Sequence, residues 1–355
     1  MSGTSLDGID AALVDASGTH PRLLGHHYQP YPQALKDALL ALHQPAHDEL
    51  HHAQLIANQL ARDYADATLA LLHKARISAA EVRAIGCHGQ TIRHRPEYGY
   101  SLQLNNPALL AELTGIAVAA DFRNRDIAAG GQGAPLVPAF HDRVLRDPTT
   151  HRVIVNIGGI SNLTDLAPGQ PTLGFDCGPG NLLMDAWIFR HLNHPYDPDG
   201  SWAECGNVLP SLLERMLAEP FFAAAPPKSS GRDLFNMDWL DTRLTGQEEA
   251  VDVQATLLAL TARSIADSIR QYCPGAQEIY LCGGGAHNTA LVRRLKEALP
   301  ECYIAPTAAL GVDADWMEAI AFAWLAQQTL HGRPANLPAA TGARHPCMLG
   351  AIYPA

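Results

Sequence analysis

Charged side chains are scarce in this 355-residue chain, at 17% of its residues, and acidic residues outnumber basic ones. Lys and Arg total 25 against 36 for Asp and Glu, which gives a formal net charge of −11 with histidines neutral. A nucleic-acid-binding protein needs a basic surface, and no basic excess is present to build one. No uncharged apolar run reaches the roughly 18 residues that suggest a membrane helix. We therefore expect neither nucleic acid nor a membrane as a partner.

Cysteine is also sparse, with seven residues, an odd number, and neither a CxxC pair nor another spacing typical of a metal site. This pattern indicates reduced thiols rather than a disulfide framework. The segment Met1–Gly8 lacks the basic start and the apolar core of a secretory signal. We therefore expect a cytoplasmic protein with no metal bound by its own side chains.

What the chain does contain is an alternation of short apolar runs and longer amphipathic segments, which indicates an α/β fold. Hydrophobic residues make up 47% of the chain, enough to build the cores of about two domains. Residues 151–157 and 160–166 flank Gly158-Gly159, a pattern that predicts a β-hairpin. We place the domain boundary near residues 145–150, with lobes at 1–148 and 149–355. The predicted strands include 9–14, 84–87, 116–120, 172–176 and 278–282, and the predicted helices 48–75, 181–192, 251–272 and 316–330.

Two glycine-rich segments are candidate nucleotide-binding elements. Residues 2–10 combine glycines, hydroxyls and two carboxylates, which suit a phosphate and its Mg²⁺, although an ordinary turn fits equally well. They match neither the P-loop nor the dinucleotide-binding pattern. Gly283, Gly284 and Gly285 follow a strand and precede a helical pattern from Ala286, an arrangement that lets a nucleotide approach the backbone. The alternative is a tight strand-to-helix connection.

Two acidic side chains, Asp176 and Asp185, lie at and just after the end of a predicted strand. Binding sites of open α/β sheets lie beyond the carboxyl ends of the strands, so either carboxylate can serve as a general base or a metal contact. The alternative for each is a solvated acid or a helix cap. The spacing does not choose between them.

Further polar segments carry weaker signals. His88 and His94 are six residues apart, a spacing that does not align two metal ligands on a helix, whereas Gln90 and Thr91 suit hydrogen bonding to a polar ligand. Arginines can bind a carboxylate or phosphate through two parallel hydrogen bonds, but each also suits a solvated, salt-bridged loop. The basic side chains in question are Arg93, Arg123, Arg125, Lys228 and Arg232.

Taken together, these segments resemble one family, the anhydro-N-acetylmuramic acid kinases of bacterial cell-wall recycling. The resemblance extends over nearly the whole chain in order. Its segments are MSGTSLDGID at 1–10, GCHGQTIRH at 86–94, DFRNRDIAAGGQGAPLVPAFH at 121–141, NIGGISNL at 156–163, GFDCGPGNLLMDAW at 174–187, PKSSGRDLFN at 227–236, CGGGAHN at 282–288 and MEAIAFAWLA at 317–326. It implies a two-lobed fold of the actin, hexokinase and Hsp70 type around a central ATP cleft, and the family suggests a homodimer.

The resemblance also implies roles for individual residues. The catalytic base falls on Asp185. ATP is bound by Gly3, Thr4, Ser5, Leu6, Asp7, Gly8, Ile9, Asp10, Gly283, Gly284, Gly285 and Asn288, with Mg²⁺ carried by the nucleotide. The sugar is bound by His88, Gln90, Arg123, Asp176 and Glu318, among which Asp176 organises the site. The first lobe then holds the phosphate loop and part of the sugar site, and the second holds the catalytic Asp and the adenosine-binding turn.

The implied activity is ATP-dependent hydrolytic opening of 1,6-anhydro-N-acetylmuramic acid, with phosphorylation to N-acetylmuramic acid 6-phosphate, in peptidoglycan recycling. We expect Arg93, Arg123 and Lys228 to supply a local positive field for the two anionic ligands. Two alternatives are an ordinary sugar kinase and an ATP-binding regulator of the Hsp70 type without sugar chemistry.

The sequence departs from the family pattern at two places. Asn124 stands where the family usually has Arg. Family members also usually carry a short apolar strand before MSGTSLDG, and this chain begins at that Met. We expect the strand at 9–14 to lack a partner along one edge and the phosphate loop beside it to be loose.

Overall fold

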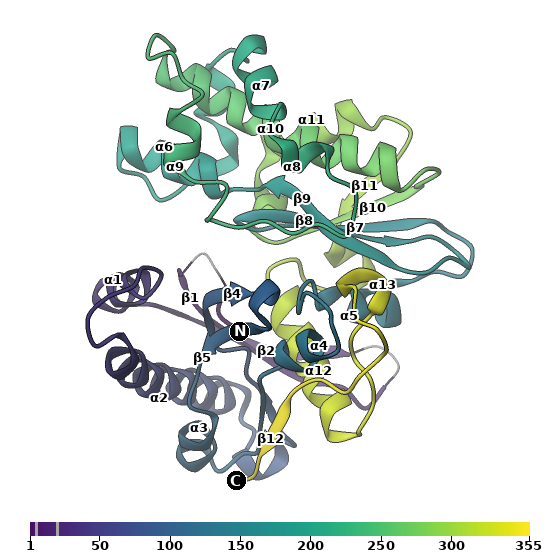
Figure 1. The fold of residues 1–355 in the computed structure, drawn as a ribbon. Helices are drawn as coiled ribbons and strands as arrows, with labels where there is room; N and C mark the ends of the chain where they lie inside the picture. Colours follow the sequence, from purple (N-terminus) through teal and green to yellow (C-terminus); the bar gives the residue numbers. More distant parts are fainter. Residues whose placement is uncertain (4–5, 19–20) are drawn as a thin grey trace. The chain divides into compact units, whose positions relative to one another are not determined.

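The computed structural model describes residues 1–3, 6–18 and 21–355 and is an α/β protein, as predicted (Figure 1). The chain forms two compact units. Unit 1 combines Met1–Val144 with Trp316–Ala355, and unit 2 comprises Leu145–Asp315. No helix of the described residues is long and apolar enough to cross a membrane.

The predicted division into 1–148 and 149–355 is wrong for the last part of the chain, because Trp316–Ala355 returns to unit 1. Strand β12 (Ala351–Tyr353) pairs antiparallel with β6 (Val118–Ala120), and helix α12 (Met317–Leu330) packs against strands of unit 1. An apolar helix pattern predicts burial but not the partner. The local pattern therefore does not predict this return.

Unit 2 is built on a five-stranded sheet in the order β11-β10-β7-β8-β9. The predicted hairpin is confirmed, because β7 (Arg152–Ile157) and β8 (Ile160–Leu166) pair antiparallel, and β9 (Leu173–Pro179) follows antiparallel to β8. Strands β10 (Glu278–Cys282) and β11 (Tyr303–Pro306) run parallel to β7.

Helices of unit 2 cover one face of this sheet in Figure 1. Val153, Val155 and Ile157 on β7 are fully buried in the resulting core, as the run of β-branched residues predicts. The long α10 contributes an apolar stripe to the same core. The helices are α6 (Leu182–Leu192), α7 (Pro210–Leu217), α8 (Pro220–Ala223), α9 (Met237–Asp241), α10 (Ala250–Tyr272) and α11 (Thr289–Ala298).

The described residues of unit 1 form three small sheets: β1-β2, β12-β6-β3 and β4-β5. Helices α2 and α12 both pack against β1, and α12 also packs against β3 and β6. The remaining strands are β1 (Gly8–Asp15), β2 (Arg22–Pro30), β3 (Ile85–Gly86), β4 (Gln90–Arg95) and β5 (Tyr100–Leu104). The remaining helices are α1 (Gln33–Ala41), α2 (Glu49–Ala75), α3 (Pro107–Thr114), α4 (Asn124–Ala128), α5 (Val137–Leu145) and α13 (Pro338–Thr341).

Local sequence signals set several helix ends. The Asn106 side chain caps α3 by accepting a hydrogen bond from the Leu109 N–H at 3.1 Å, and Gly115 ends that helix in the left-handed region. Strand bounds differ from the predicted ones by up to three residues, as at the end of β9, and the start of one helix was wrong: the glycine triplet leads into a 3₁₀ turn, η5 (Gly284–His287), and α11 begins only at Thr289. The reason is that the side chain of Asn288 accepts a hydrogen bond from the Leu291 N–H and starts a new helix there.

Strand β1 pairs antiparallel with β2 on one edge. On its other edge Met1 exchanges two backbone hydrogen bonds with Asp10: its ammonium donates to the Asp10 carbonyl at 2.7 Å, and its carbonyl accepts the Asp10 N–H at 2.8 Å. Burial lowers the pKa of the Met1 ammonium. Residues added before Met1 would therefore continue this ladder along β1 toward Val14.

We expect an extension of about six apolar residues before Met1, the length of a typical strand, to raise Tm and tighten ATP binding, because it would replace a buried charge by a paired strand. A Gly/Ser extension of equal length is the control. Scanning calorimetry and ATP titration measure both effects. Equal Tm and equal ATP affinity for the two extended proteins would contradict the expectation.

Candidate active site

In unit 2, the predicted catalytic helix begins directly over the β7–β8 turn. The Gly180 N–H donates to the Gly159 carbonyl at 2.9 Å, and the Asn181 N–H donates to the Gly158 carbonyl at 2.8 Å. A Cβ on Gly180 would lie 2.2 Å from the Gly158 oxygen, so only glycine permits this approach. The contacts between the β7–β8 turn and residues 180–181 therefore place the start of α6 at the end of the sheet.

The two candidate acids lie on consecutive elements of this unit. Asp185 is half-buried in the first turn of α6, with its N–H donating to the Asn181 carbonyl at 2.8 Å. Asp176 lies on β9, where its Oδ2 accepts the Ser230 N–H at 2.8 Å and its own N–H donates to the Lys228 carbonyl at 3.1 Å. The Asp176 carboxylate thus holds the 228–230 loop in place.

All three cations expected to supply a positive field have protein partners of their own, and those of Arg123 are His88 and Gly133. The Lys228 ammonium donates to the carbonyls of Phe221 at 3.1 Å and Phe222 at 3.3 Å and lies 4.7 Å from the centre of the Phe221 ring. Burial lowers the pKa of Lys228. Arg93 forms an ion pair with Glu49. Lys228 and Arg93 therefore have structural roles that sequence spacing could not reveal.

The glycine triplet packs against the end of β7. A Cβ on Gly283 would lie 2.4 Å from Asn156 Oδ1, and one on Gly285 would lie 2.3 Å from Ile157 Cγ2. A Cβ on Gly284 would have as its nearest neighbour only Asn181 Nδ2, at 3.7 Å. The fold therefore requires glycine at 283 and 285 but leaves space at 284, beside the residue that precedes α6.

Asn288, predicted to bind ATP, has a structural role in the described chain. Its Oδ1 accepts the Leu291 N–H at 3.0 Å and so caps α11. The same oxygen would lie 2.6 Å from a Cβ on Gly200, so the loop at Gly200 packs closely on this cap. Asn288 therefore fixes where α11 starts after the glycine turn.

In unit 1, the first residues of the chain are hydrogen-bonded to the turn at His88–Gln90. Gln90 Nε2 donates to the Gly3 carbonyl at 3.0 Å, and Ser2 Oγ donates to the Gly89 carbonyl at 3.1 Å. Ser2 belongs to the candidate phosphate-binding segment 2–10, but the resemblance assigned it no role of its own. Two predicted ATP-binding residues, Thr4 and Ser5, lie outside the described residues. The structure thus brings the predicted phosphate loop and part of the predicted sugar site together.

The rest of the predicted phosphate loop is anchored in the β1–β2 hairpin. Leu6 is buried at a positive φ of 59°, and Ile9 is buried in the same core. The Gly8 N–H donates to Asp7 Oδ1 at 2.9 Å, and a Cβ on Gly8 would lie 2.4 Å from the Gln29 oxygen. These contacts fix the C-terminal side of the loop.

Glu318, predicted to bind the sugar, lies in the first turn of α12. The carboxylates of Glu318 and Asp10 interact electrostatically with the Met1 ammonium. Each of them favours the charged form of the ammonium. One turn further along α12, the Phe322 ring lies 4.7 Å from the His88 ring. Glu318 therefore lies within electrostatic range of Met1, at the start of the chain.

His88 joins Arg123 to this loop through both of its ring nitrogens. Nδ1 lies 3.2 Å from the Ser2 carbonyl, which can only accept, so Nδ1 carries the proton. Nε2 then accepts from Arg123 Nη2 at 2.9 Å and Nε at 3.3 Å. Burial, with the nearby Arg123 charge, holds the pKa of His88 well below its usual value, so the ring is neutral. His88 therefore holds Arg123 rather than presenting a free ring nitrogen to a ligand.

We expect the protein to lose stability below about pH 6.5. His88 is neutral in the folded state, and burial lowers the pKa of His141 to about 3. Because the unfolded chain binds protons that the folded chain does not, the free energy of unfolding falls as the pH decreases from 7.5 to 5, by about 2 kcal/mol for His141 and in the same direction for His88. Urea unfolding at the two pH values measures this difference, and His141→Gln should remove about 2 kcal/mol of it. A slope unchanged by that substitution would contradict the assignment.

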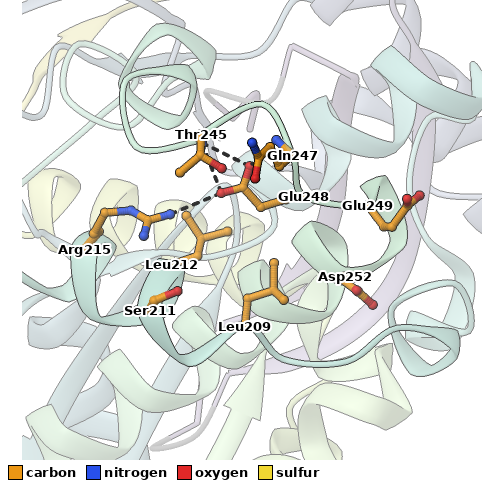
Figure 2. Close-up of a pocket in the computed structure, with 9 residues that line it drawn as sticks. All are labelled: Leu209, Ser211, Leu212, Arg215, Thr245, Gln247, Glu248, Glu249 and Asp252. Carbon is orange, nitrogen blue, oxygen red and sulfur yellow. Dashed lines mark hydrogen bonds and ion pairs between the residues drawn. The ribbon is translucent and has the colours of Figure 1, made fainter.

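The pocket drawn in Figure 2 lies elsewhere in unit 2, between α7 and the start of α10. Arg215 and Glu248 form an ion pair of 3.2 Å there, and the lining contains none of the predicted site residues. Across residues 1–3, 6–18 and 21–355, no group of three or more His, Cys, Asp or Glu side chains is arranged to hold a metal ion.

Comparison with known proteins gives consistent matches over the full length. The family model described as anhydro-N-acetylmuramic acid kinase matches residues 1–355. Relatives with that name include proteins from Nitrosospira multiformis, 59% identical, and Pseudomonas putida, 53% identical, each match covering 100% of this chain and 98% of the relative.

Two solved structures have lower similarity to this chain. A ROK family glucokinase from Streptomyces griseus, in complex with glucose and AMPPNP, is 14% identical, with coverage of 91% of this chain and 97% of that chain and a TM-score of 0.41. Component A of the (R)-2-hydroxyglutaryl-CoA dehydratase from Acidaminococcus fermentans is 11% identical. The match covers 89% of this chain and 96% of that chain, with a TM-score of 0.44.

Proposed function

Because the chain belongs to the anhydro-N-acetylmuramic acid kinase family, we propose that it opens 1,6-anhydro-N-acetylmuramic acid with water and phosphorylates the same molecule from ATP. The observation that carries the proposal is the family match over residues 1–355. The position of Asp185 supports the proposal. Asp185 lies on α6, and Asn181, the residue just before this helix, lies beside the 283–285 turn. We place this reaction in the cytoplasm, in peptidoglycan recycling.

Asp185 is the proposed general base. It removes a proton from a water molecule, whose oxygen attacks the anomeric carbon C1 of the sugar. The C1–O6 bond breaks, and O6 forms a bond to the γ-phosphorus of ATP as ADP leaves. The products are N-acetylmuramic acid 6-phosphate, ADP and a proton. General-base catalysis of this kind contributes about 10²- to 10⁴-fold in rate.

ATP enters as a co-substrate with its own Mg²⁺, which neutralises charge on the transferred phosphoryl group. We assign the phosphates to the loop from Gly3 to Asp10, including Thr4 and Ser5, and the adenosine to the turn at 283–285. Asn288 supports that turn by capping α11. The space at Gly284 is consistent with close approach of a nucleotide to the backbone.

We assign sugar binding to Arg123 and Gln90 in unit 1, with Glu318 nearby. Gln90 is fully buried, its Nε2 is occupied by the Gly3 carbonyl, and its Oε1 has no hydrogen-bond partner among the described residues. A buried amide oxygen of this kind is expected to accept a hydrogen bond from a polar ligand. Asp176 organises the site by holding the 228–230 loop, and His88 by holding Arg123.

Mass spectrometry of the reaction products tests the proposed function. Purified protein with ATP, Mg²⁺ and the anhydro sugar should yield a sugar heavier by one phosphoryl group and one water molecule. An ordinary sugar kinase would add the phosphoryl group alone, and an ATP-binding regulator would leave the sugar unchanged. Either result would overturn the proposal. The homodimer suggested by the family can be tested by sedimentation of the same sample.

A further inference from the structure

Asp126, on α4, is a fully buried carboxylate that none of the roles above uses. Its Oδ1 accepts hydrogen bonds from Asn336 Nδ2 at 2.7 Å and Thr341 Oγ1 at 2.8 Å, both in the returning C-terminal segment of unit 1. Its Oδ2 accepts the Gly133 N–H at 2.8 Å. The two oxygens therefore face different partners, and removing an acceptor would leave a buried donor unsatisfied.

The loop at 130–133 is shaped around this carboxylate. A Cβ on Gly131 would lie 2.2 Å from Asp126 Oδ2, and the Gly131 N–H donates to the Asp126 carbonyl at 2.9 Å. Gly133 has a φ of 67°, a conformation that glycine adopts readily. The Gln132 N–H donates to the Thr341 carbonyl at 2.7 Å. The position of the Gly133 backbone thus depends on the hydrogen bond from its N–H to Oδ2 of Asp126.

The same residue, Gly133, also holds Arg123. While its N–H donates to Asp126, its carbonyl accepts from Arg123 Nη1 at 2.8 Å. The other side of the guanidinium donates to His88 Nε2, and His88 Nδ1 donates to the Ser2 carbonyl. One hydrogen-bonded chain therefore runs from the buried carboxylate through Arg123 to the predicted phosphate loop.

We propose that Asp126 is a positioning residue for sugar binding: through Gly133 it sets the orientation of the Arg123 guanidinium. This inference rests on the proposed function, in which Arg123 binds the sugar. A residue with a purely packing role would affect the stability of unit 1 without a selective effect on one substrate. A positioning residue changes the binding of the ligand that Arg123 contacts, because an oriented guanidinium loses less freedom when it binds.

Asp126→Asn is the test variant, because it keeps the shape but exchanges one acceptor oxygen for a donor NH₂. The expected result is a KM for the anhydro sugar raised about tenfold or more, with the KM for ATP within about twofold of wild type and kcat little changed. Thr341→Val is the matched control. It removes a donor on the Oδ1 side and leaves the Gly133 contact, so it should lower Tm without changing the sugar KM.

A second measurement does not depend on turnover. The Nε–H of Arg123, assigned in NMR spectra by its loss in Arg123→Lys, should exchange with solvent about tenfold faster in Asp126→Asn and at the wild-type rate in Thr341→Val. If wild type leaves the anhydro sugar unchanged, the proposed function fails, while this exchange rate still tests the positioning. Wild-type exchange in Asp126→Asn, or equal changes in both variants, would overturn the role of Asp126.

Discussion

Asp185→Asn is expected to lower kcat by about 10²-fold or more while ATP affinity changes little. The substitution keeps the shape of the side chain and removes its basicity, so the attacking water loses its proton acceptor. Asp185 is half-buried in the first turn of α6, and the helix start is held by backbone contacts of Gly180 and Asn181. Folding should therefore survive. Steady-state kinetics and ATP titration of the purified variant measure the two effects.

Asp176→Asn is the matched control for this experiment. The Asp176 carboxylate accepts the Ser230 N–H, so its loss should loosen the 228–230 loop and affect sugar binding more than the chemical step. Near-normal kcat in monodisperse Asp185→Asn, together with a large loss in Asp176→Asn, would transfer the role of general base to Asp176.

Gly284→Val is expected to weaken ATP binding by about tenfold or more without lowering Tm. A Cβ at this position would lie 3.7 Å from its nearest neighbour, Asn181 Nδ2, so the fold leaves space for a side chain to start there. The space is the one we assign to the nucleotide, and a β-branched side chain there would keep ATP from the backbone. Conformational strain is not part of the effect, because Gly284 has no positive φ. Calorimetric titration with ATP and thermal unfolding provide the two measurements.

Gly285→Ala supplies the contrasting variant. Its Cβ would collide with Ile157 Cγ2 at 2.3 Å, so this smaller substitution should lower Tm. Unchanged ATP affinity in Gly284→Val would mean that the triplet is only a connection between β10 and α11.

Much of the fold followed from the sequence, because the local signals there were strong. Hydrophobic periodicity predicted β8 and β10 with their observed bounds, and Asn106 and Gly115 predicted the ends of α3. The return of residues 316–355 to unit 1 was not predicted, because that pairing depends on a tertiary contact between β12 and β6. The start of α11 was misplaced because a cap at Asn288 was not considered.

The sequence motifs predicted which segments form the candidate site. They did not predict the hydrogen bonds that join the side chains of these segments. The motifs selected His88, Gln90 and Arg123, yet spacing gave no sign that His88 uses both ring nitrogens to join Arg123 to Ser2. Asp126 is another example, since its partners Asn336 and Thr341 lie more than 200 positions away along the chain. Lys228 looked like a ligand for an anion because the sequence does not show that the carbonyls of Phe221 and Phe222, on α8, occupy its ammonium.

The central claim is that one enzyme couples water attack at C1 to phosphorylation of O6, and isotope labelling tests it most directly. The reaction is run with ATP, Mg²⁺ and the anhydro sugar in ¹⁸O-labelled water, and the product is analysed promptly by fragmentation mass spectrometry. The C1 hydroxyl exchanges slowly with solvent, so product incubated alone in labelled water serves as the control. We predict one labelled oxygen at C1 and none in the phosphate group. A phosphorylated product without label at C1 would contradict the account.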